Sequence, residues 1–297
     1  MNLHSKEYLF ISAIAIVLLN IFLGRMLVLH LQIPADSPVV EKNRIEHQDP
    51  FANISLAAQA AIVWDIKKGA PIFTQNEDAQ LPLASLTKIM TALVAFEEKG
   101  DEGVVVVSKE AIREEGDHGF AVGERWRLKD LIDATLTTSS NDGAHALASV
   151  FTAQTAGDDV FRESVFIQRM NQKVKELGLT QTFFADEVGL DFNLGISSAY
   201  GSAHDKARLL EYVVLSHPTL MEATTRALLT TRSLDGITHN LENTNKFVET
   251  LPAVVASKTG FTDLAGGNLA LVFEAGPARP IAVVVLGSTA EERFSDA

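Results

Sequence analysis

Hydrophobic and polar residues follow one another with two different periods along this chain, which divide it into strand-like ends and a helix-like middle. Short apolar runs bounded by glycine, proline and polar turns predict strands. The runs are QAAIVWDI and APIFTQN around a KKG turn, VVVV at 104–107, and PAVVASKTG, GNLALVFEA and PIAVVVLGS after residue 251. We expect a hairpin from the first two, a short buried strand from the third and an antiparallel meander from the last three.

Between these ends, apolar residues recur at the spacing of an amphipathic helix. The segments are 85–99, 126–136, 142–151, 159–177 and 202–217. Gly100 and Gly178 stop the first and fourth segments, and Ser202 with Asp205 forms a variant capping box for the last. Strands on both sides of a helical middle predict an α+β domain, with an antiparallel sheet built from both ends of the domain and a helical subdomain inserted between them.

The first residues have a different character. From Tyr8 to Gly24 the chain is apolar except for Ser12 and Asn20, and apolar residues continue beyond Arg25. At 1.5 Å per residue, about 24 helical residues would cross the roughly 30 Å core of a bilayer. We therefore expect one transmembrane helix before the domain.

This segment could be a retained anchor or a cleaved signal peptide. The anchor is favoured because the apolar run is longer than a usual signal core and no clear small-x-small site precedes Ala35. Lys6 fits a cytoplasmic amino end, which would put the rest of the chain on the extracytoplasmic side. The predicted organisation is a membrane segment at 1–33, a polar linker at 34–57 and a catalytic domain at 58–297.

Composition narrows the function classes. The net charge of −13 argues against a nucleic-acid partner, because phosphate binding needs a basic face. The chain has no cysteine, which excludes disulfides, thiolate catalysis and cysteine-ligated metals. Its histidines form no HExxH pair, and single ones such as His118 and His145 are interpreted as surface or packed residues.

Candidate chemistry begins at Ser85 and Lys88, which lie one helical turn apart at the head of the first helical segment. An ordinary structural explanation exists, in which Ser85 is an N-cap and Lys88 extends to water from the rim of the helix. The alternative is a serine nucleophile beside a lysine base. The choice depends on partners elsewhere in the chain.

Two further motifs supply partners. Ser139-Ser140-Asn141 lies in a polar turn between two predicted helices, and Lys258-Thr259-Gly260 ends an apolar strand. Each alone has a structural explanation, as an N-cap cluster for a helix starting near Asp142 and as a strand ending in a turn. In this order and at these places, Ser-x-x-Lys, Ser-x-Asn and Lys-Thr-Gly together resemble the motif set of penicillin-binding proteins and class A β-lactamases.

Within that superfamily the chain resembles the D-alanyl-D-alanine carboxypeptidases, the low-molecular-mass penicillin-binding proteins, over about residues 57–295. The "NTN" before the third motif, "KTGFTDLAGGNLA", the "GL" at 189–190 and "SSAYGSAHDKARL" carry the resemblance. It implies a β-lactamase/transpeptidase-like fold and a serine peptidase that acts on peptidoglycan stem peptides ending in D-Ala-D-Ala. It also implies covalent inhibition by β-lactams and no metal or organic cofactor.

The chain departs from the family pattern in two places. The family often adds a small β domain and a carboxy-terminal amphipathic anchor, which are missing here. It also usually has a long final helix where this chain has "EERFSDA", which raises the possibility of a poorly covered sheet face.

The resemblance also implies residue roles. Ser85 attacks the carbonyl between the two D-alanines, Lys88 accepts its proton, and Ser139 relays a proton to the leaving amine. A lysine is a base near neutral pH only if burial or a like charge lowers its pKa, and Lys258 could supply that charge.

The remaining residues would bind substrate. Asn141 holds the peptide amide, Thr259 binds the terminal carboxylate, and Gly260 leaves room for a peptide along the strand edge. The N–H groups of Ser85 and Phe261 form the oxyanion hole.

Three alternatives stay open. A serine β-lactamase shares the fold but needs a carboxylate to activate the deacylating water, and Glu187-Val188-Gly189-Leu190-Asp191 is a near miss to the Glu-x-x-Leu-Asn stretch of class A enzymes. We interpret it as the loop before "GL", since it ends in aspartate and lies farther from the Ser-x-Asn motif than the class A pattern suggests. A D,D-endopeptidase and a sensor that is acylated only once are the other two.

Overall fold

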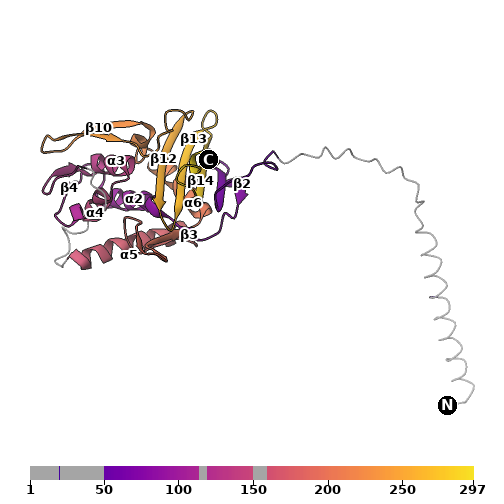
Figure 1. Ribbon diagram of the computed structural model, residues 1–297, viewed down its shortest axis with the longest axis horizontal. Coiled ribbons are helices and arrows are strands. Elements are labelled where there is room, and N and C mark those ends of the chain that lie inside the picture. Colours follow the sequence, from indigo (N-terminus) through magenta and orange to yellow (C-terminus); the bar gives the residue numbers. More distant parts are fainter. Residues whose placement is uncertain (1–19, 21–49, 114–118, 150–158) are drawn as a thin grey trace, which may run out of the picture. The chain divides into compact units, whose positions relative to one another are not determined.

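The computed structural model describes Asn20 and residues 50–113, 119–149 and 159–297 (Figure 1). Asn53–Ala297 forms one compact unit. None of the helices in these described ranges is long and apolar enough to cross a membrane. The predicted membrane segment lies outside the described residues, apart from Asn20.

The central sheet has five antiparallel strands in the order β12-β13-β14-β1-β2 (Figure 1). Their bounds are β1 Ala60–Asp65, β2 Ala70–Gln75, β12 Val254–Thr262, β13 Gly266–Glu274 and β14 Pro280–Ser288. β1 pairs with β14 from Ala60↔Leu286 to Asp65↔Ile281. The predicted hairpin, meander and joining of both ends of the domain are confirmed, and β12 forms one edge of the sheet.

The helical part contains α2 Thr87–Lys99, α3 Leu128–Thr138, α4 Asn141–Ala148 and α5 Asp159–Leu177, and α6 Ala203–Ser216 packs on β1 and β14. α2 contacts α3, α4 and α5, and its residues from Thr87 to Ala95 are all buried. A helix surrounded in this way must be apolar on nearly every side, which its sequence satisfies. The predicted helices are confirmed, with small shifts of their ends.

Short elements complete the fold. The strands are β3 Leu81–Pro82, β4 Val104–Val106, β5 Arg125–Arg127, β6 Phe183–Phe184, β7 Asp191–Asn193, β8 Ile196–Ser197, β9 Ala199–Gly201, β10 Leu228–Arg232 and β11 Thr238–Glu242. The helical turns are η1 Ala84–Leu86, η2 Ala111–Arg113 and η4 Glu222–Thr225, and α7 is Arg293–Asp296. The sequence pattern indicated only β4 among these.

The prediction of a buried strand at 104–107 was partly wrong. In β4 only Val105 is buried, whereas Val104 and Val106 are exposed. β4 pairs with β5 as a two-stranded ribbon, so its side chains alternate between core and solvent. Trp126 belongs to β5, and the predicted helix starts two residues later, at Leu128.

Only one of the two hydrogen bonds of the predicted capping box of α6 forms. The hydroxyl of Ser202 accepts a hydrogen bond from the backbone N–H of Asp205 at 3.1 Å. The carboxylate of Asp205 instead accepts from the N–H of Gln181 and the hydroxyl of Thr182, each at 2.8 Å. The residue that would close the box therefore ties α6 to the loop after α5.

The sheet face opposite α6 carries its own small apolar cluster, with buried Leu269, Leu271 and Val285 at its centre. Leu251 and Phe294 pack against this cluster from outside the sheet. The short helix α7 therefore covers part of the sheet face that was expected to be poorly covered.

Candidate active site

Ser85 lies in the turn η1 between β3 and α2, not at the N-cap of the helix. The N-cap of α2 is Leu86, which makes no side-chain capping bond. The residue before Ser85, Ala84, has a φ of 47°, a left-handed conformation that is unfavourable for a residue with a Cβ. The N-cap explanation of Ser85 is therefore wrong, and the serine stands on a strained turn.

Two glycines hold this turn in place. Gly189 has a φ of 89°, and a Cβ there would lie 2.1 Å from the carbonyl oxygen of Ala84. At Gly260 on β12, a Cβ would lie 3.1 Å from the backbone nitrogen of Ser85. Glycine at both positions lets the loop before β7 and the edge strand β12 approach the nucleophile from two sides.

Lys88 is fully buried, so the explanation that it extends to water is wrong. Its Nζ lies 2.9 Å from Ser85 Oγ, 2.8 Å from Asn141 Oδ1 and 2.9 Å from the carbonyl oxygen of Val188. A neutral amine has two N–H donors and one lone pair. The oxygens of Asn141 and Val188 can only accept, whereas the hydroxyl of Ser85 can donate. A neutral Lys88 could therefore donate to those two oxygens and accept the proton of Ser85.

A second serine–lysine pair lies at the sheet edge. Lys258 on β12 is buried, and its Nζ donates to Ser139 Oγ at 2.8 Å and to the carbonyl of Thr259 at 2.7 Å. Burial, followed by the charges of Lys88 and Arg293, lowers the pKa of Lys258 well below its ordinary value. Because Ser139 accepts from Lys258, its own hydroxyl proton is available to a third group.

The turn between α3 and α4 presents both Ser139 and Asn141. Ser139 has a φ of 61° at the C-cap of α3, and Ser140 caps α4 by accepting from the N–H of Gly143 at 3.0 Å. The N-cap prediction is confirmed, with α4 starting one residue earlier than Asp142. Asn141 was predicted to hold the substrate amide, which stays a prediction, and the contact of its Oδ1 with Lys88 adds a role in placing the base.

The "NTN" segment joins this turn to β12. The N–H of Thr244 donates to the carbonyl of Thr137 at the end of α3, at 3.1 Å. The hydroxyl of Thr259 donates to that of Thr244 at 2.6 Å. Asn245 donates to Ser257 on β12 at 2.7 Å. The segment therefore sets the separation between Ser139 and the Lys-Thr-Gly strand.

Arg293 is a site residue that the sequence reasoning missed. Its guanidinium donates to the carbonyl of Gly260 at 2.7 Å, and burial lowers its pKa. Its charge adds to that of Lys258 at the edge of β12, where Phe261 is half exposed. The sequence signal was weak, since Arg293 is a single basic residue in an acidic segment two strands away from the motif.

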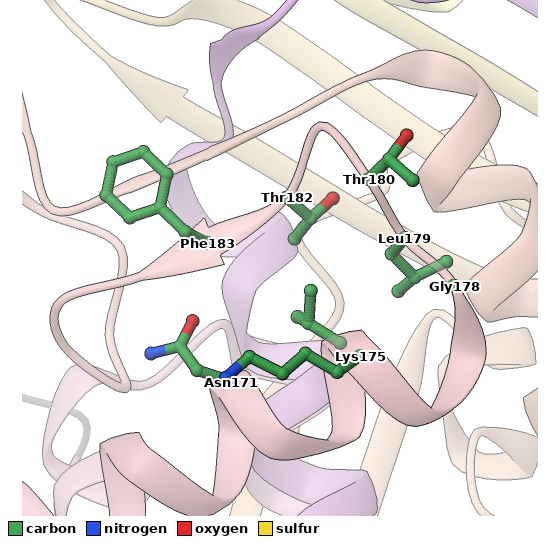
Figure 2. A pocket seen from close by; sticks show the side chains of 8 residues that line it. Asn171, Lys175, Gly178, Leu179, Thr180, Thr182 and Phe183 are labelled. Carbon is green, nitrogen blue, oxygen red and sulfur yellow. The ribbon is translucent and has the colours of Figure 1, made fainter.

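A pocket of about 580 Å³ lies elsewhere, between α5 and β6 (Figure 2). Its lining includes Asn171, Thr182 and Phe183. The amide of Asn171 is bonded to the backbone of Phe184, and the hydroxyl of Thr182 to Asp205. The pocket contains none of the predicted site residues, and these two polar groups are already used within the protein.

The Ser85–Lys88 pair, with Lys88 buried, and the Ser139–Lys258 pair beside the edge strand β12 are the arrangement expected of a serine acyl-enzyme of the penicillin-binding protein class. The sequence profile of the S11 peptidases, described as D-alanyl-D-alanine carboxypeptidase, matches residues 43–289. The chain therefore belongs to the D-alanyl-D-alanine carboxypeptidase family, whose members are serine peptidases.

Individual relatives agree with this assignment. D-alanyl-D-alanine carboxypeptidase DacF of Bacillus subtilis is 30% identical over 80% of this chain and 59% of its own length. A D-alanyl-D-alanine endopeptidase of Pseudomonas aeruginosa is 28% identical over 73% of this chain and 67% of its own. Penicillin-binding protein D2 of Listeria monocytogenes, solved with ampicillin bound, has a TM-score of 0.65 and 30% identity, covering 82% of this chain and 95% of that one. The chain thus spans less than two thirds of the length of DacF.

Proposed function

We propose that this protein is a serine D-Ala-D-Ala carboxypeptidase that removes the terminal D-alanine from peptidoglycan stem peptides. The observation that carries the proposal is the 2.9 Å contact between Ser85 Oγ and Lys88 Nζ, an amine that also contacts the carbonyl oxygens of Asn141 and Val188. Family membership supports the substrate class.

Acylation begins when Lys88 takes the hydroxyl proton of Ser85 as the oxygen attacks the carbonyl between the two D-alanines. The N–H groups of Ser85 and Phe261 stabilise the oxyanion. The amide C–N bond then breaks, and the leaving nitrogen takes a proton from Ser139, which Lys258 can replace. The products of this step are free D-alanine and an acyl-serine ester.

Deacylation reverses the roles. The proton that Lys88 took from Ser85 first passes by way of Ser139 to Lys258, which replaces the proton given to the leaving amine and leaves Lys88 neutral. Lys88 then takes a proton from the water molecule that attacks the ester, and returns it to the Ser85 oxygen as the C–O bond breaks. The shortened stem peptide leaves. Each step uses side chains of this protein and water.

Substrate orientation follows from charge and strand geometry. An extended peptide can add to the edge strand β12, with its chain passing over Gly260. Its terminal carboxylate would then face Thr259 and the positive charges of Lys258 and Arg293. Requirement for a free carboxylate is the property that separates a carboxypeptidase from a general amidase.

The test compares two reactions of the purified protein. A peptide ending in D-Ala-D-Ala should release D-alanine in many turnovers, and a chromogenic cephalosporin should give one slow stoichiometric burst. Labelled penicillin should attach to the wild-type chain and not to Ser85→Ala. Labelling of Ser85→Ala would reject the site, and a burst without any release of D-alanine would indicate a sensor.

Rapid turnover of the cephalosporin would instead indicate a β-lactamase. Glu187→Gln tests that alternative, because a lactamase that uses this carboxylate would lose turnover and keep acylation. The structure directs the Glu187 carboxylate to His145, 2.9 Å away, which favours the loop interpretation.

D,D-endopeptidase activity is the second candidate, because relatives with that name match this chain nearly as well as the carboxypeptidases do. An endopeptidase cuts a crosslink, in which the carbonyl of the D-alanine of one stem is bonded to an amine of another stem instead of to a terminal D-alanine. Mass spectrometry of purified crosslinked and uncrosslinked muropeptides after incubation distinguishes the two. Loss of crosslinked dimers would establish the endopeptidase reaction.

The apolar segment at 1–33 is proposed to anchor the protein in the cell membrane, with the catalytic domain on the extracytoplasmic side where peptidoglycan lies. The support is the length of the apolar run and Lys6 before it. Intact-mass measurement of protein extracted from membranes tests the anchor. A mature form starting near residue 35 would mean that the segment is a signal peptide.

A further inference from the structure

His145 and Glu187 form a contact beside the catalytic lysine that the mechanism above does not use. Nδ1 of His145 lies 2.9 Å from Oε1 of Glu187. The side chain of Glu187 is 1% exposed, whereas that of His145 is 21% exposed. Burying a carboxylate is costly unless a partner compensates it, so a contact of this kind needs a reason.

Glu187 and the two residues after it contact α2 or the turn before it. The carbonyl of Glu187 accepts from the hydroxyl of Thr91 at 2.6 Å, and the carbonyl of Val188 accepts from Lys88. Gly189 then packs against Ala84 beside the nucleophile. Three consecutive loop residues therefore lie along the start of α2 and the turn before it.

The other side of Lys88 is bounded by α4. Asn141, which accepts from Lys88, and His145 lie one helical turn apart and so share a face of α4. The contacts close a ring that runs from Lys88 through Asn141 and α4 to His145, and back through Glu187 and Val188. The His145–Glu187 contact is the part of this ring that joins α4 to the loop directly.

We propose that His145 and Glu187 are a positioning pair that holds the Asn141 and Val188 oxygens at the separation which directs the lone pair of Lys88 at Ser85. The inference rests on the proposed function, since it concerns the base of that reaction. Without the pair, α4 and the loop can separate, and Lys88 can turn its lone pair away from the nucleophile. Small misplacements of catalytic groups lower rates by up to roughly 100-fold.

The second oxygen of Glu187 makes the pair interdependent. Oε2 is buried and has no hydrogen-bond partner within the described ranges. Removing His145 alone therefore leaves a buried carboxylate without its compensating contact, which costs more than the contact itself contributes. Removing both residues avoids this cost.

The experiment measures the rate of Ser85 acylation by labelled penicillin at saturating and limiting concentrations, with release of D-alanine as a second readout. We expect His145→Ala to lower the saturating acylation rate by about 10- to 100-fold with little change in the concentration for half-maximal rate. Glu187→Gln keeps a hydrogen-bonding oxygen and should stay within about threefold of wild type. His145→Ala/Glu187→Ala should be faster than His145→Ala.

A matched control exists in the same domain. His239 and Glu124 form a second buried pair, with Nε2 2.7 Å from Oε1, between β11 and the segment before β5. His239→Ala should lower thermal stability by an amount similar to that of His145→Ala. It should leave the saturating acylation rate near wild type when both variants are assayed well below their melting temperatures.

Three outcomes would overturn the proposal. They are an unchanged acylation rate in folded His145→Ala, an equal loss in His239→Ala, and a double variant that is no faster than His145→Ala. Acylation does not require release of D-alanine. A wild-type protein that acylates without releasing D-alanine would therefore reject the proposed function while the positioning pair is still tested.

Discussion

Gly189 packs so closely on Ala84 that any side chain at position 189 would meet the carbonyl oxygen of the residue before the nucleophile, at 2.1 Å from its Cβ. The same glycine has a φ of 89°. A side chain is therefore excluded twice, by contact and by backbone conformation. The strained turn that carries Ser85 depends on this contact, because Ala84 would otherwise relax from its φ of 47°.

Gly189→Ala should consequently reduce acylation by labelled penicillin by about 100-fold or more, since the turn carrying Ser85 must move. Gly178→Ala is the matched control. Gly178 has a φ of 67°, but a Cβ there meets no atom within 4 Å. The control should lose about 1 kcal/mol of stability and keep its acylation rate. Equal acylation by the two variants would contradict the role given to the Gly189 contact.

Lys88→Arg should be nearly inactive, because a guanidinium keeps its proton near neutral pH and cannot accept one from Ser85. The proposed mechanism uses Lys88 as the base, with its buried amine 2.9 Å from Ser85 Oγ. Acylation rates measured by stopped flow or by gel labelling decide the matter. Near-wild-type acylation of Lys88→Arg would require another base.

The binding of substrate should weaken at alkaline pH through Lys258. Its pKa lies well below the ordinary lysine value, so its charge is present at low pH and is lost as pH rises through the lowered pKa. KM for a peptide with a free carboxylate should therefore rise with pH, well before pH 10.5. Arg293→Gln removes a positive charge that lowers the pKa of Lys258. In that variant the rise of KM should therefore occur at a higher pH. A KM that is flat from neutral to alkaline pH would remove Lys258 from carboxylate binding.

Lys206→Met should stabilise the protein. Lys206 on α6 is fully buried, its ammonium lies 4.9 Å from the ring centre of Phe184, and burial lowers its pKa to about 7. The unfolded chain keeps the proton on Lys206 up to a pH near 10.5, whereas the folded chain keeps it only up to a pH of about 7. Wild-type stability therefore rises with pH across that window. The gain from Lys206→Met should be largest, up to roughly 4 kcal/mol, at and below pH 7.

The same gain should shrink toward zero as pH approaches 10.5. Urea unfolding at several pH values measures it, and Lys67→Met, at an exposed lysine in the β1–β2 turn, is the control. A gain that does not depend on pH would mean that improved packing, and not the charge of Lys206, is responsible.

Hydrophobic periodicity predicted the sheet and the main helices because an element that is buried on one face has apolar residues at regular spacing in the sequence. The three motifs predicted that Ser85, Lys88, Ser139 and Lys258 lie in one site, because each motif is local and the fold only has to bring the three together. The hydrogen bond between Lys258 and Ser139 was not predicted. The strained φ of Ala84, the short strands β6 to β9 and the approach of Arg293 to Gly260 left no such pattern in the sequence. They result from contacts between distant segments, which spacing along one chain does not reveal.

The pairing of β1 with β14 has a consequence for how the enzyme becomes reactive during its synthesis. Ala60 finds its partner only when Leu286 has been made, and closing a loop of that length is slow compared with forming the local helix α2. The nucleophile is therefore synthesised long before the strand that brings Lys258 and Gly260 to it. A nascent chain should be inert toward β-lactams until the last strand of the sheet has joined the first, so that chemical reactivity reports completion of the fold.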